Sequence, residues 1–229
     1  MATSVYQFKG DPYSSHSVIL SHLREGEGRR LLDVGAATGY LAERLSSRGY
    51  EITCLEGDAS LAAAASRACS EVLVADLDGP LPLLKGPFDV IVYGDILEHL
   101  KDPLRVFMMI NEHLRSNGTV IVSVPNVANI WVRIQLLLGK FEYADRGILD
   151  RTHMRFFTLR SFRTFLQEAN VDVVKLLSTP IPLPLLVPER YQGPIFQLAH
   201  AANARLARIW KSLFAYQFVV VARRSKHEA

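Results

Sequence analysis

Short apolar segments alternate with helical patterns between residues 30 and 124 of this chain. The segments are largely apolar at consecutive positions, which is typical of strands whose two faces are both buried. Such strands form parallel sheets that are covered by helices on both sides, and the repeated strand–helix order predicts an α/β doubly wound sheet. The first five strands are expected at residues 30–34, 51–55, 71–75, 88–93 and 119–124.

Capping signals and apolar periodicity place the helices. Asp102 and Pro103 suit a helix start, and this helix is expected to run to Asn117 and Gly118. Thr158 suits the cap of a later helix. The other helices are expected at residues 14–23, 40–48, 60–69, 127–138, 158–169 and 194–213. Two late strands are expected at residues 171–177 and 216–222.

Composition excludes several classes of protein. The net charge of +3 is small and scattered, so nucleic acid is not expected as the main partner. Cys54 and Cys69 have no metal-ligand spacing, and neither a disulfide framework nor a metal site is expected. Residues 1–9 lack the apolar centre of a signal peptide, and no apolar run reaches the ~18 residues that cross a bilayer. A soluble cytoplasmic protein is expected.

A glycine-rich segment, DVGAATG at residues 33–39, joins the first strand to the first helix. Glycines here let backbone amides approach a ligand, and the helix N-terminus favours a negative group such as a carboxylate. Ala37 stands at the second glycine of the dinucleotide pattern G-x-G-x-x-G, where its Cβ obstructs a pyrophosphate. Asp33 would repel phosphate but could hold an ammonium group or order the loop. The segment therefore indicates a nucleoside that bears an amino acid.

Two acidic residues follow the next two strands. Glu56 ends the second strand, where a carboxylate can accept both hydroxyls of a ribose. Asp76 ends the third strand, where it can accept a hydrogen bond from an adenine amine. The carboxyl ends of neighbouring parallel strands meet at one edge of a sheet. The glycine-rich segment, Glu56 and Asp76 are therefore expected to form one site.

These residues resemble those of the class I S-adenosylmethionine-dependent methyltransferases. Residues 33–39 match the first motif of that family, and residues 88–100, FDVIVYGDILEHL, match its strand-four motif. Glu98-His99 is typical of the branch of ubiquinone-type O-methyltransferases, and residues 149–158 resemble bacterial small-molecule methyltransferases. The resemblance implies a Rossmann-like, seven-stranded, mostly parallel sheet whose last strand is antiparallel.

The resemblance also implies the cofactor and its site. The cofactor would be S-adenosyl-L-methionine, with S-adenosyl-L-homocysteine as the product. The implied cofactor-binding residues are Asp33, Gly35, Ala37, Gly39, Glu56, Gly57, Asp76, Leu77 and Gly94. A single methyltransferase domain over residues 1–229 is expected, with a helical cap at 1–28, a cofactor-binding core at 29–126, a substrate-side segment at 127–170 and an insertion at 179–213.

Two histidines are candidates for a general base. Methyl transfer from a sulfonium is an in-line displacement in which the enzyme mainly aligns the acceptor, and a hydroxyl acceptor also benefits from a base. His99 follows the fourth strand, and Asp150 precedes His153 closely enough to orient its ring. The structural alternatives are helix packing for His99 and an ordinary surface loop for His153. We predict O-methylation of a small molecule in secondary-metabolite or polysaccharide-type biosynthesis.

Further residues are expected on the acceptor side. Arg151 and Arg155 flank His153 and could bind a carboxylate or phosphate, unless they form ordinary surface ion pairs. Asn126 follows the fifth strand, and Tyr13 could close over the cofactor. The full set is Tyr13, Asn126, Asp150, Arg151 and Arg155. Core or lid positions are expected for Trp131, Phe141, Tyr143 and Phe157.

The predicted helix at 194–213 carries apolar residues with Arg205, Arg208 and Lys211 among them. A basic amphipathic helix can lie on an anionic membrane, which would suit a lipid-linked acceptor. The alternatives are packing on its own domain or on the second copy of a homodimer.

Other functions remain as alternatives. An N-methyltransferase that acts on a small amine is an alternative, because neither candidate histidine excludes it. A non-catalytic cofactor-binding protein, which would retain only the cofactor site, is another. An NAD-linked oxidoreductase is disfavoured by Ala37. Nucleic-acid methylation is disfavoured because the chain has no basic tract and no Asn-Pro-Pro-Tyr-type motif.

Overall fold

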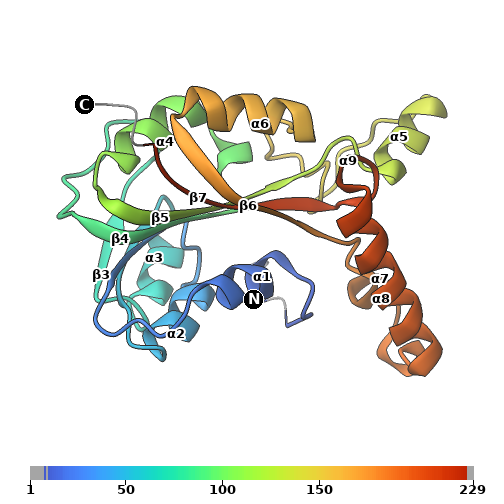
Figure 1. Ribbon diagram of the computed structural model, residues 1–229, viewed down its shortest axis with the longest axis horizontal. Helices are drawn as coiled ribbons and strands as arrows, with labels where there is room; N and C mark the ends of the chain where they lie inside the picture. The colour runs from blue at the N-terminus through green and yellow to red at the C-terminus, as the bar shows by residue number, and fades with distance from the viewer. Residues whose placement is uncertain (1–7, 9, 226–229) are drawn as a thin grey trace.

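One mixed sheet forms the centre of the computed structural model, which describes residue 8 and residues 10–225 (Figure 1). Its strand order is β3-β2-β1-β4-β5-β7-β6. The strands are β1 Arg30–Val34, β2 Glu51–Glu56, β3 Glu71–Val74, β4 Phe88–Gly94, β5 Leu114–Pro125, β6 Val171–Thr179 and β7 Gln217–Arg224. The first five pair in parallel, and β7 runs antiparallel to both β5 and β6. The predicted sheet, with an antiparallel last strand, is confirmed.

Helices cover both faces of the sheet, as Figure 1 shows. On one face lie α1 (Ser15–His22), α2 (Tyr40–Ser46) and α3 (Ala59–Ala65), and on the other lie α4 (Pro103–Asn111) and α6 (Leu159–Glu168). The remaining elements are η1 Leu97–His99, α5 Ile130–Leu137, α7 Leu183–Leu186, η2 Glu189–Tyr191, α8 Pro194–Ile209 and α9 Lys211–Phe214.

Two apolar clusters hold these layers together. The larger cluster packs β4, β5 and β7 against α4 and α6 through Phe107, Phe162 and Phe218. The smaller cluster packs the other face against α1 and α2 through Ile19 and Leu45. Strands with apolar residues on both faces therefore separate the two clusters, as the sequence pattern predicts.

The capping predictions are confirmed, but one helix is shorter than expected. The Asp102 side chain accepts from the Arg105 amide, and Thr158 forms a capping box with Ser161. Helix α4 ends at Asn111 instead of reaching residue 117. The expected end was wrong because β5 already begins at Leu114, opposite Phe88 of β4, and sheet pairing overrides local helix preference there.

A disulfide joins Cys54 of β2 to Cys69, just beyond α3. The expectation that these cysteines form no disulfide was wrong. They are 15 residues apart in the sequence, and the return of the chain from α3 to β3 brings their Cα atoms within 6.1 Å.

Helix α5 and the segment α7–α9 project at one end of the sheet (Figure 1). Here Trp131, Phe141 and Tyr143 are exposed, so none of the three is a core residue and only the lid alternative stays open for them, whereas Phe157 is buried in the core. The predicted helix at 194–213 is interrupted at Trp210. Among the described residues, no helix is long and apolar enough to cross a membrane. Most of residues 1–9, where no signal peptide is expected, lie outside the described part of the chain.

Candidate functional site

In the loop between β1 and α2, every second residue from Gly35 to Gly39 has a left-handed backbone conformation. Gly35, Ala37 and Gly39 have φ angles of 74°, 48° and 76°. A Cβ on Gly35 would stand 2.6 Å from Cγ1 of Ile96, so this position requires glycine for its backbone and for its space. Ala37 adopts a conformation that is unfavourable for a residue with a Cβ. The tight turn brings the loop amides to the carboxyl edge of the sheet.

Glu56 ties this loop to the end of β2. Its Oε2 accepts a hydrogen bond of 2.7 Å from the Ala37 amide, and its Oε1 accepts one of 2.9 Å from the Asp58 amide. Each carboxylate oxygen retains a further lone pair with which to accept a hydroxyl. Glu56 can therefore order the loop and bind a ribose with the same two oxygens.

Asp33 lies buried at the end of β1, beside Glu56. Burial, and then the charge of Glu56, raise the pKa of the Asp33 carboxyl to about 7. Within the described part of the chain, nothing hydrogen-bonds to its buried Oδ2. A ligand ammonium group placed against this oxygen would supply the missing donor and stabilise the ionised form.

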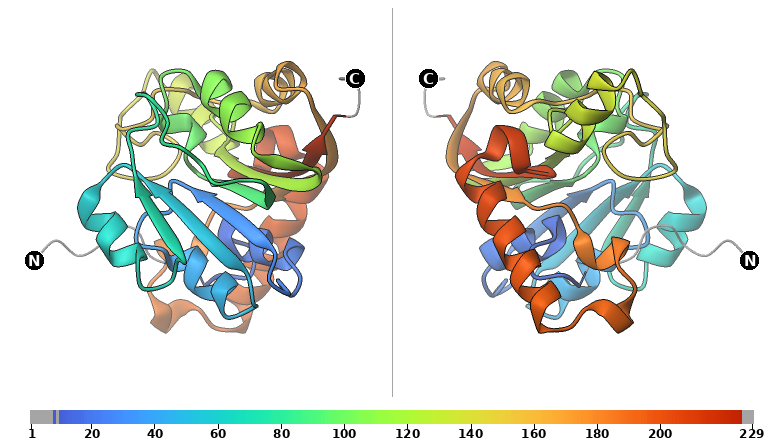
Figure 2. Two further views of the ribbon diagram at one scale, coloured as in Figure 1. Left: turned by 90° about the vertical axis from the view of Figure 1, so that its left-hand side faces the viewer. Right: turned by 90° about the vertical axis from the view of Figure 1, so that its right-hand side faces the viewer.

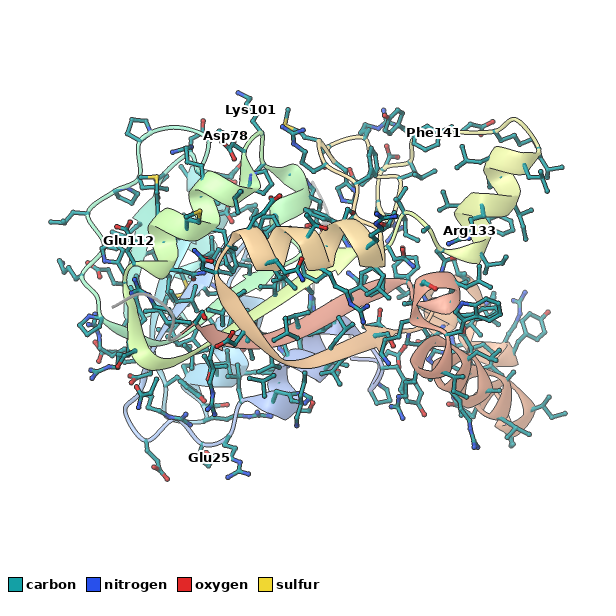
Figure 3. All side chains as sticks on the ribbon, turned by 45° about the horizontal axis from the view of Figure 1, so that its top comes forward. Glu25, Asp78, Lys101, Glu112, Arg133 and Phe141 are labelled. Carbon is teal, nitrogen blue, oxygen red and sulfur yellow. A yellow bond between two sulfur atoms is a disulfide. The ribbon has the colours of Figure 1, made fainter. Side chains whose placement is uncertain are left out.

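The remaining predicted cofactor residues lie at the ends of β2, β3 and β4. Asp76 Oδ1 accepts from the Asp78 amide at 2.9 Å, and Asp78 Oδ1 accepts from the Lys101 amide at 2.9 Å. Figure 3 shows Asp78 and Lys101 side by side at this edge. Leu77 is buried in the larger apolar cluster. At Gly94 a Cβ would meet nothing within 4 Å, and at Gly57 it would lie 3.6 Å from the Ala75 carbonyl oxygen.

This arrangement fits S-adenosylmethionine. The bound amino-acid part would lie near the loop and Asp33, the ribose would lie against Glu56, and open space remains at Gly94. The structure brings the predicted cofactor residues to one edge, except that Leu77 contributes chiefly to packing.

The two candidate histidines meet beyond β4. The ring centroids of His99 and His153 lie 4.7 Å apart, with the rings edge to face. Thr152 Oγ1 donates to Asp150 Oδ1 at 2.7 Å and lies 3.1 Å from His99 Nδ1. Because the hydroxyl has one proton and the carboxylate takes it, Thr152 must accept from His99 Nδ1. This hydrogen-bond pattern assigns neutral His99 an unprotonated Nε2.

A backbone carbonyl orients His153. Its Nδ1 lies 3.0 Å from the carbonyl oxygen of Ile148, which can only accept, so Nδ1 carries the proton and Nε2 has the lone pair. The expectation that Asp150 orients His153 was wrong. The Asp150 carboxylate accepts instead from the Thr152 hydroxyl, which contacts His99. That carboxylate accepts the Thr152 amide as well.

Burial shifts the pKa values of both histidines downward. It is the main cause for His99, where it outweighs the opposing effects of Thr152, Asp150 and Asp95. For His153, burial acts together with the charge of His99. Both imidazoles are therefore neutral at neutral pH, which is the form that can accept a proton.

Asp95 links the end of β4 to three other elements. It has a φ of 56° and accepts hydrogen bonds from the side chains of Gln217 (2.8 Å), Ser15 (3.2 Å) and Ser123. These partners come from β7, α1 and β5. The network holds the turn between β4 and η1 against the neighbouring elements, and His99 is the last residue of η1.

Glu98, His99 and His153 could also hold a metal ion. One potential ligand atom from each lies within 4.8 Å of the others, and His153 Nε2 is 4.0 Å from Glu98 Oε1. A carboxylate oxygen with two imidazole nitrogens is a donor set suited to divalent transition metals. No metal site is expected from the sequence, and these three residues were not predicted as a set of ligands.

The predicted acceptor-side residues do not gather at one point. Arg151 pairs with Asp145 at 2.8 Å on the surface, and Arg155 donates to the Lys101 carbonyl. Asn126 is fully buried, donates to the Ala215 carbonyl and accepts from the Ala128 amide. The surface ion pair that is the structural alternative for Arg151 is therefore present.

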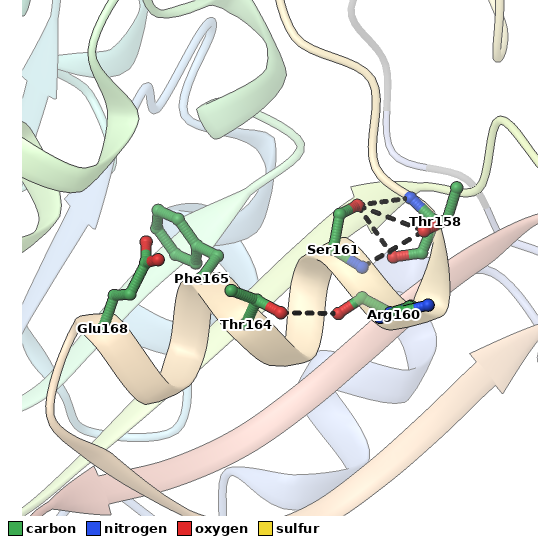
Figure 4. Close-up of a pocket in the computed structure, with 6 residues that line it drawn as sticks. All are labelled: Thr158, Arg160, Ser161, Thr164, Phe165 and Glu168. Atoms are coloured by element: carbon green, nitrogen blue, oxygen red, sulfur yellow. Dashed lines mark hydrogen bonds between the residues drawn. The ribbon is translucent and has the colours of Figure 1, made fainter.

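Tyr13 contacts α8, and a separate depression lies along α6. The Tyr13 ring stands edge-on to His200 of α8, with centroids 5.2 Å apart. A depression of about 330 Å³ lies along α6 (Figure 4). It is lined by Thr158, Arg160, Ser161, Thr164, Phe165 and Glu168. None of these is a predicted site residue.

Three residues of this site, Asp95, Glu98 and Thr152, were not predicted from the sequence. Asp95 and Glu98 stand in the strand-four motif beside His99, and that spacing was the available signal. Thr152 lies between Asp150 and His153, but its contact with His99 crosses 53 residues of sequence. No local pattern indicates such a contact.

Comparisons with known proteins find methyltransferases. The family model of the methyltransferase domain matches residues 17–176. A ubiquinone biosynthesis O-methyltransferase of a Caulobacter species is 30% identical over 157 residues, which are 64% of this chain and 61% of that protein. The chain thus spans less than two thirds of that relative.

Solved structures share the fold at low identity. An S-adenosylmethionine-dependent methyltransferase of Mesorhizobium loti has a TM-score of 0.62 and 16% identity, with 91% of this chain and 96% of that chain covered. A putative methyltransferase of Haloferax volcanii, solved with a methyltransferase activator, has a TM-score of 0.64 and 16% identity, with 92% and 89% covered. At this identity the likeness supports the fold alone.

Proposed function

This chain belongs to the class I S-adenosylmethionine-dependent methyltransferases, and from that premise we propose that it methylates a hydroxyl of a small molecule. The single observation that carries the choice of a hydroxyl is the chain of hydrogen bonds from Asp150 through Thr152 to His99. These hydrogen bonds leave His99 Nε2 unprotonated, so that a basic nitrogen lies beyond the carboxyl end of β4. An O-methyltransferase needs such a base, because a neutral hydroxyl is a weak nucleophile.

The predicted cofactor residues would divide the binding between them. The glycine-rich loop and Asp33 would hold the amino-acid part, and Glu56 would hold the ribose hydroxyls while it orders the loop through Ala37. Asp76 would accept from the adenine amine. When bound, the cofactor supplies a methyl group that is already activated on a sulfonium.

The histidine pair would prepare the acceptor. His99 Nε2 would take the hydroxyl proton as the oxygen attacks, and the negative charge of Asp150 would stabilise the resulting imidazolium through Thr152. His153 would serve as a second neutral imidazole at the same point. Thr152 is a positioning residue in this scheme, because it acts on the acceptor only through His99.

The relatives support the same type of reaction. The Caulobacter relative is named for O-methylation in ubiquinone biosynthesis. We propose a hydroxylated small molecule as the acceptor here, in secondary-metabolite or polysaccharide-type biosynthesis. An acceptor that carries a carboxylate or phosphate would have to displace Arg151 from Asp145 or Arg155 from the Lys101 carbonyl.

A methyl-transfer assay tests this proposal. Purified protein with radiolabelled S-adenosylmethionine is incubated with panels of phenols, hydroxylated sugars and small amines. Methylation of a hydroxyl, with His99→Asn and Thr152→Val lowering kcat on the order of 10²-fold and about tenfold, would support it. Arg160→Gln, on the outer side of α6, is a matched control that should keep full activity.

Other outcomes assign a different function. Methylation of amines alone would favour an N-methyltransferase. Cofactor binding with no transfer to any panel member would favour a non-catalytic cofactor-binding protein. Loss of activity on chelation, restored by a divalent cation, would assign Glu98, His99 and His153 to a metal ion instead of a base.

A further inference from the structure

Helix α8 presents its larger apolar side chains to solvent. His200, Ala204 and Ala207 are the buried side chains of this helix. On the opposite side, Ile195 and Leu198 are 86% and 74% exposed. The outward stripe follows helical spacing over Ile195, Leu198, Ala202, Leu206 and Ile209. The helix therefore packs on its own domain through His200 and two alanines and leaves its main apolar stripe exposed.

The apolar surface continues beyond α8. Leu185 and Leu186 of α7 and Trp210 after α8 are all more than half exposed. At the end of α5, Leu137 is 87% exposed and Leu138 is exposed beside it. In the right panel of Figure 2, α5 and α8 both lie on the side that is turned to the viewer. We call this set of exposed residues on α5 and α7–α8 the apolar end face.

Hydrogen bonds connect α5 to α9, which follows α8 in the chain, and so connect the two parts of the apolar end face. Asn129 at the start of α5 donates to the Ala215 carbonyl at 2.8 Å, and Arg133 donates to the Ser212 carbonyl at 3.4 Å. Figure 3 shows Arg133 on α5, near the base of this projection. Because α5 begins just after β5, the face adjoins the carboxyl edge of the sheet.

Positive charge accompanies the apolar residues. Residues 180–215 contain four basic residues and one acidic residue, which equals the net charge of +3 of the whole chain. The basic residues are Arg190, Arg205, Arg208 and Lys211. Arg205 follows Leu198 by two helical turns and precedes Leu206, so its charge flanks the apolar stripe. An apolar stripe flanked by basic side chains is the pattern of helices that lie in a lipid interface.

We propose that the apolar end face binds the surface of an anionic lipid bilayer. The outward side chains of α8 and the tip of α5 would enter the headgroup region, and Arg190, Arg205 and Lys211 would contact anionic headgroups, whereas Arg208 lies over the Tyr13 ring of its own domain. A second copy of the chain is a poorer occupant, because a two-fold symmetric contact brings the same face of each copy together. That contact would set the basic residues of one copy against those of the other. The binding does not depend on the reaction proposed above.

Vesicle co-sedimentation with the full chain tests the proposal. The probes are vesicles of phosphatidylcholine alone and vesicles of phosphatidylcholine mixed with phosphatidylglycerol. The protein should sediment with the mixed vesicles, sediment little with the neutral ones, and lose most of the binding in high salt. Ile195→Ser/Leu198→Ser/Ile209→Ser and Arg205→Glu/Arg208→Glu should each weaken binding on the order of tenfold or more.

Two control variants match these changes elsewhere on the surface. Leu83→Ser removes an apolar side chain that is 85% exposed outside the apolar end face, and Arg160→Glu/Arg163→Glu reverses two exposed charges on α6. Both should bind like the wild type, and all variants should keep its thermal unfolding midpoint. Equal losses in the controls would overturn the proposal, as would absence of binding to the mixed vesicles. A dimer that the triple serine variant dissolves, without vesicle binding, would assign the face to a second copy.

Discussion

The amide of Ala37 donates a 2.7 Å hydrogen bond to Oε2 of Glu56. This contact joins the left-handed centre of the glycine-rich loop to the acid at the end of β2. The residue proposed to bind the ribose therefore also shapes the loop that would receive the amino-acid part of the cofactor. One carboxylate thus couples the two halves of the cofactor site.

Glu56→Ala should weaken cofactor binding more than the loss of a single ribose contact would. The variant removes the partner of the Ala37 amide as well as the two hydroxyl acceptors, and charge-assisted hydrogen bonds contribute about 1.5–3 kcal/mol each. We expect the Kd for S-adenosylhomocysteine to rise at least about tenfold in fluorescence titration. Glu43→Ala, at an exposed carboxylate on α2, is the control. Wild-type affinity in Glu56→Ala would contradict the proposed site.

Ala37→Gly should be tolerated, and Ala37→Val should not. The φ of 48° at Ala37 is unfavourable for any side chain and most unfavourable for a β-branched one. The glycine variant should unfold with a free energy within about 1 kcal/mol of the wild type, because relief of strain offsets the added freedom of the unfolded chain. The valine variant should lose about 2 kcal/mol. Chemical denaturation measures both, and equal losses would contradict the left-handed assignment.

Asp33→Asn should stabilise the cofactor-free protein at alkaline pH. In the unfolded chain this carboxyl ionises near pH 4, whereas in the folded chain burial raises its pKa to about 7. Unfolding therefore releases a proton between these values, and stability falls as the pH rises through them. Above pH 7 the variant should be more stable on the order of 2–4 kcal/mol, with no such gain near pH 4. Denaturation curves at pH 4 and pH 8 measure this, and a less stable variant at pH 8 would contradict it.

The sequence was sufficient to predict the sheet and most of the proposed cofactor site. The apolar runs specify a parallel sheet, and Gly35, Glu56 and Asp76 follow successive strands in an order that local patterns reveal. The chain from Asp150 to His99 could not be predicted, because it depends on how a loop 53 residues away folds back over η1. The disulfide likewise depends on the path of α3 and not on a spacing rule.

The pH dependence of kcat/KM should show that His99 and His153 are neutral in the active enzyme. Burial lowers the pKa of His99 and of His153 below the ordinary value of 6.5, so activity should hold as the pH falls through 6.5 and decline only below it. A backbone hydrogen bond of Thr152 raises the His99 pKa, and Thr152→Val keeps that backbone group, so this variant should lower kcat while the acid limb moves little. An acid limb above pH 6.5 would contradict a buried histidine base.

Cys69→Ala should destabilise the oxidised protein and leave the reduced protein little changed. Closing a loop of about 15 residues by a disulfide contributes about 3 kcal/mol, chiefly by restricting the unfolded chain. Denaturation of the wild type and the variant, each with and without dithiothreitol, separates the crosslink from the packing of the side chain. An equal difference under both conditions would show that the crosslink contributes nothing.

The central claim is that the loop at residues 33–39, together with Glu56 and Asp76, holds S-adenosylmethionine. Calorimetric titration of the purified protein with S-adenosylhomocysteine, and separately with NADH, tests this claim most directly. We expect saturable one-to-one binding of S-adenosylhomocysteine and no heat of binding with NADH. Binding of NADH without S-adenosylhomocysteine, or binding of neither, would contradict the account.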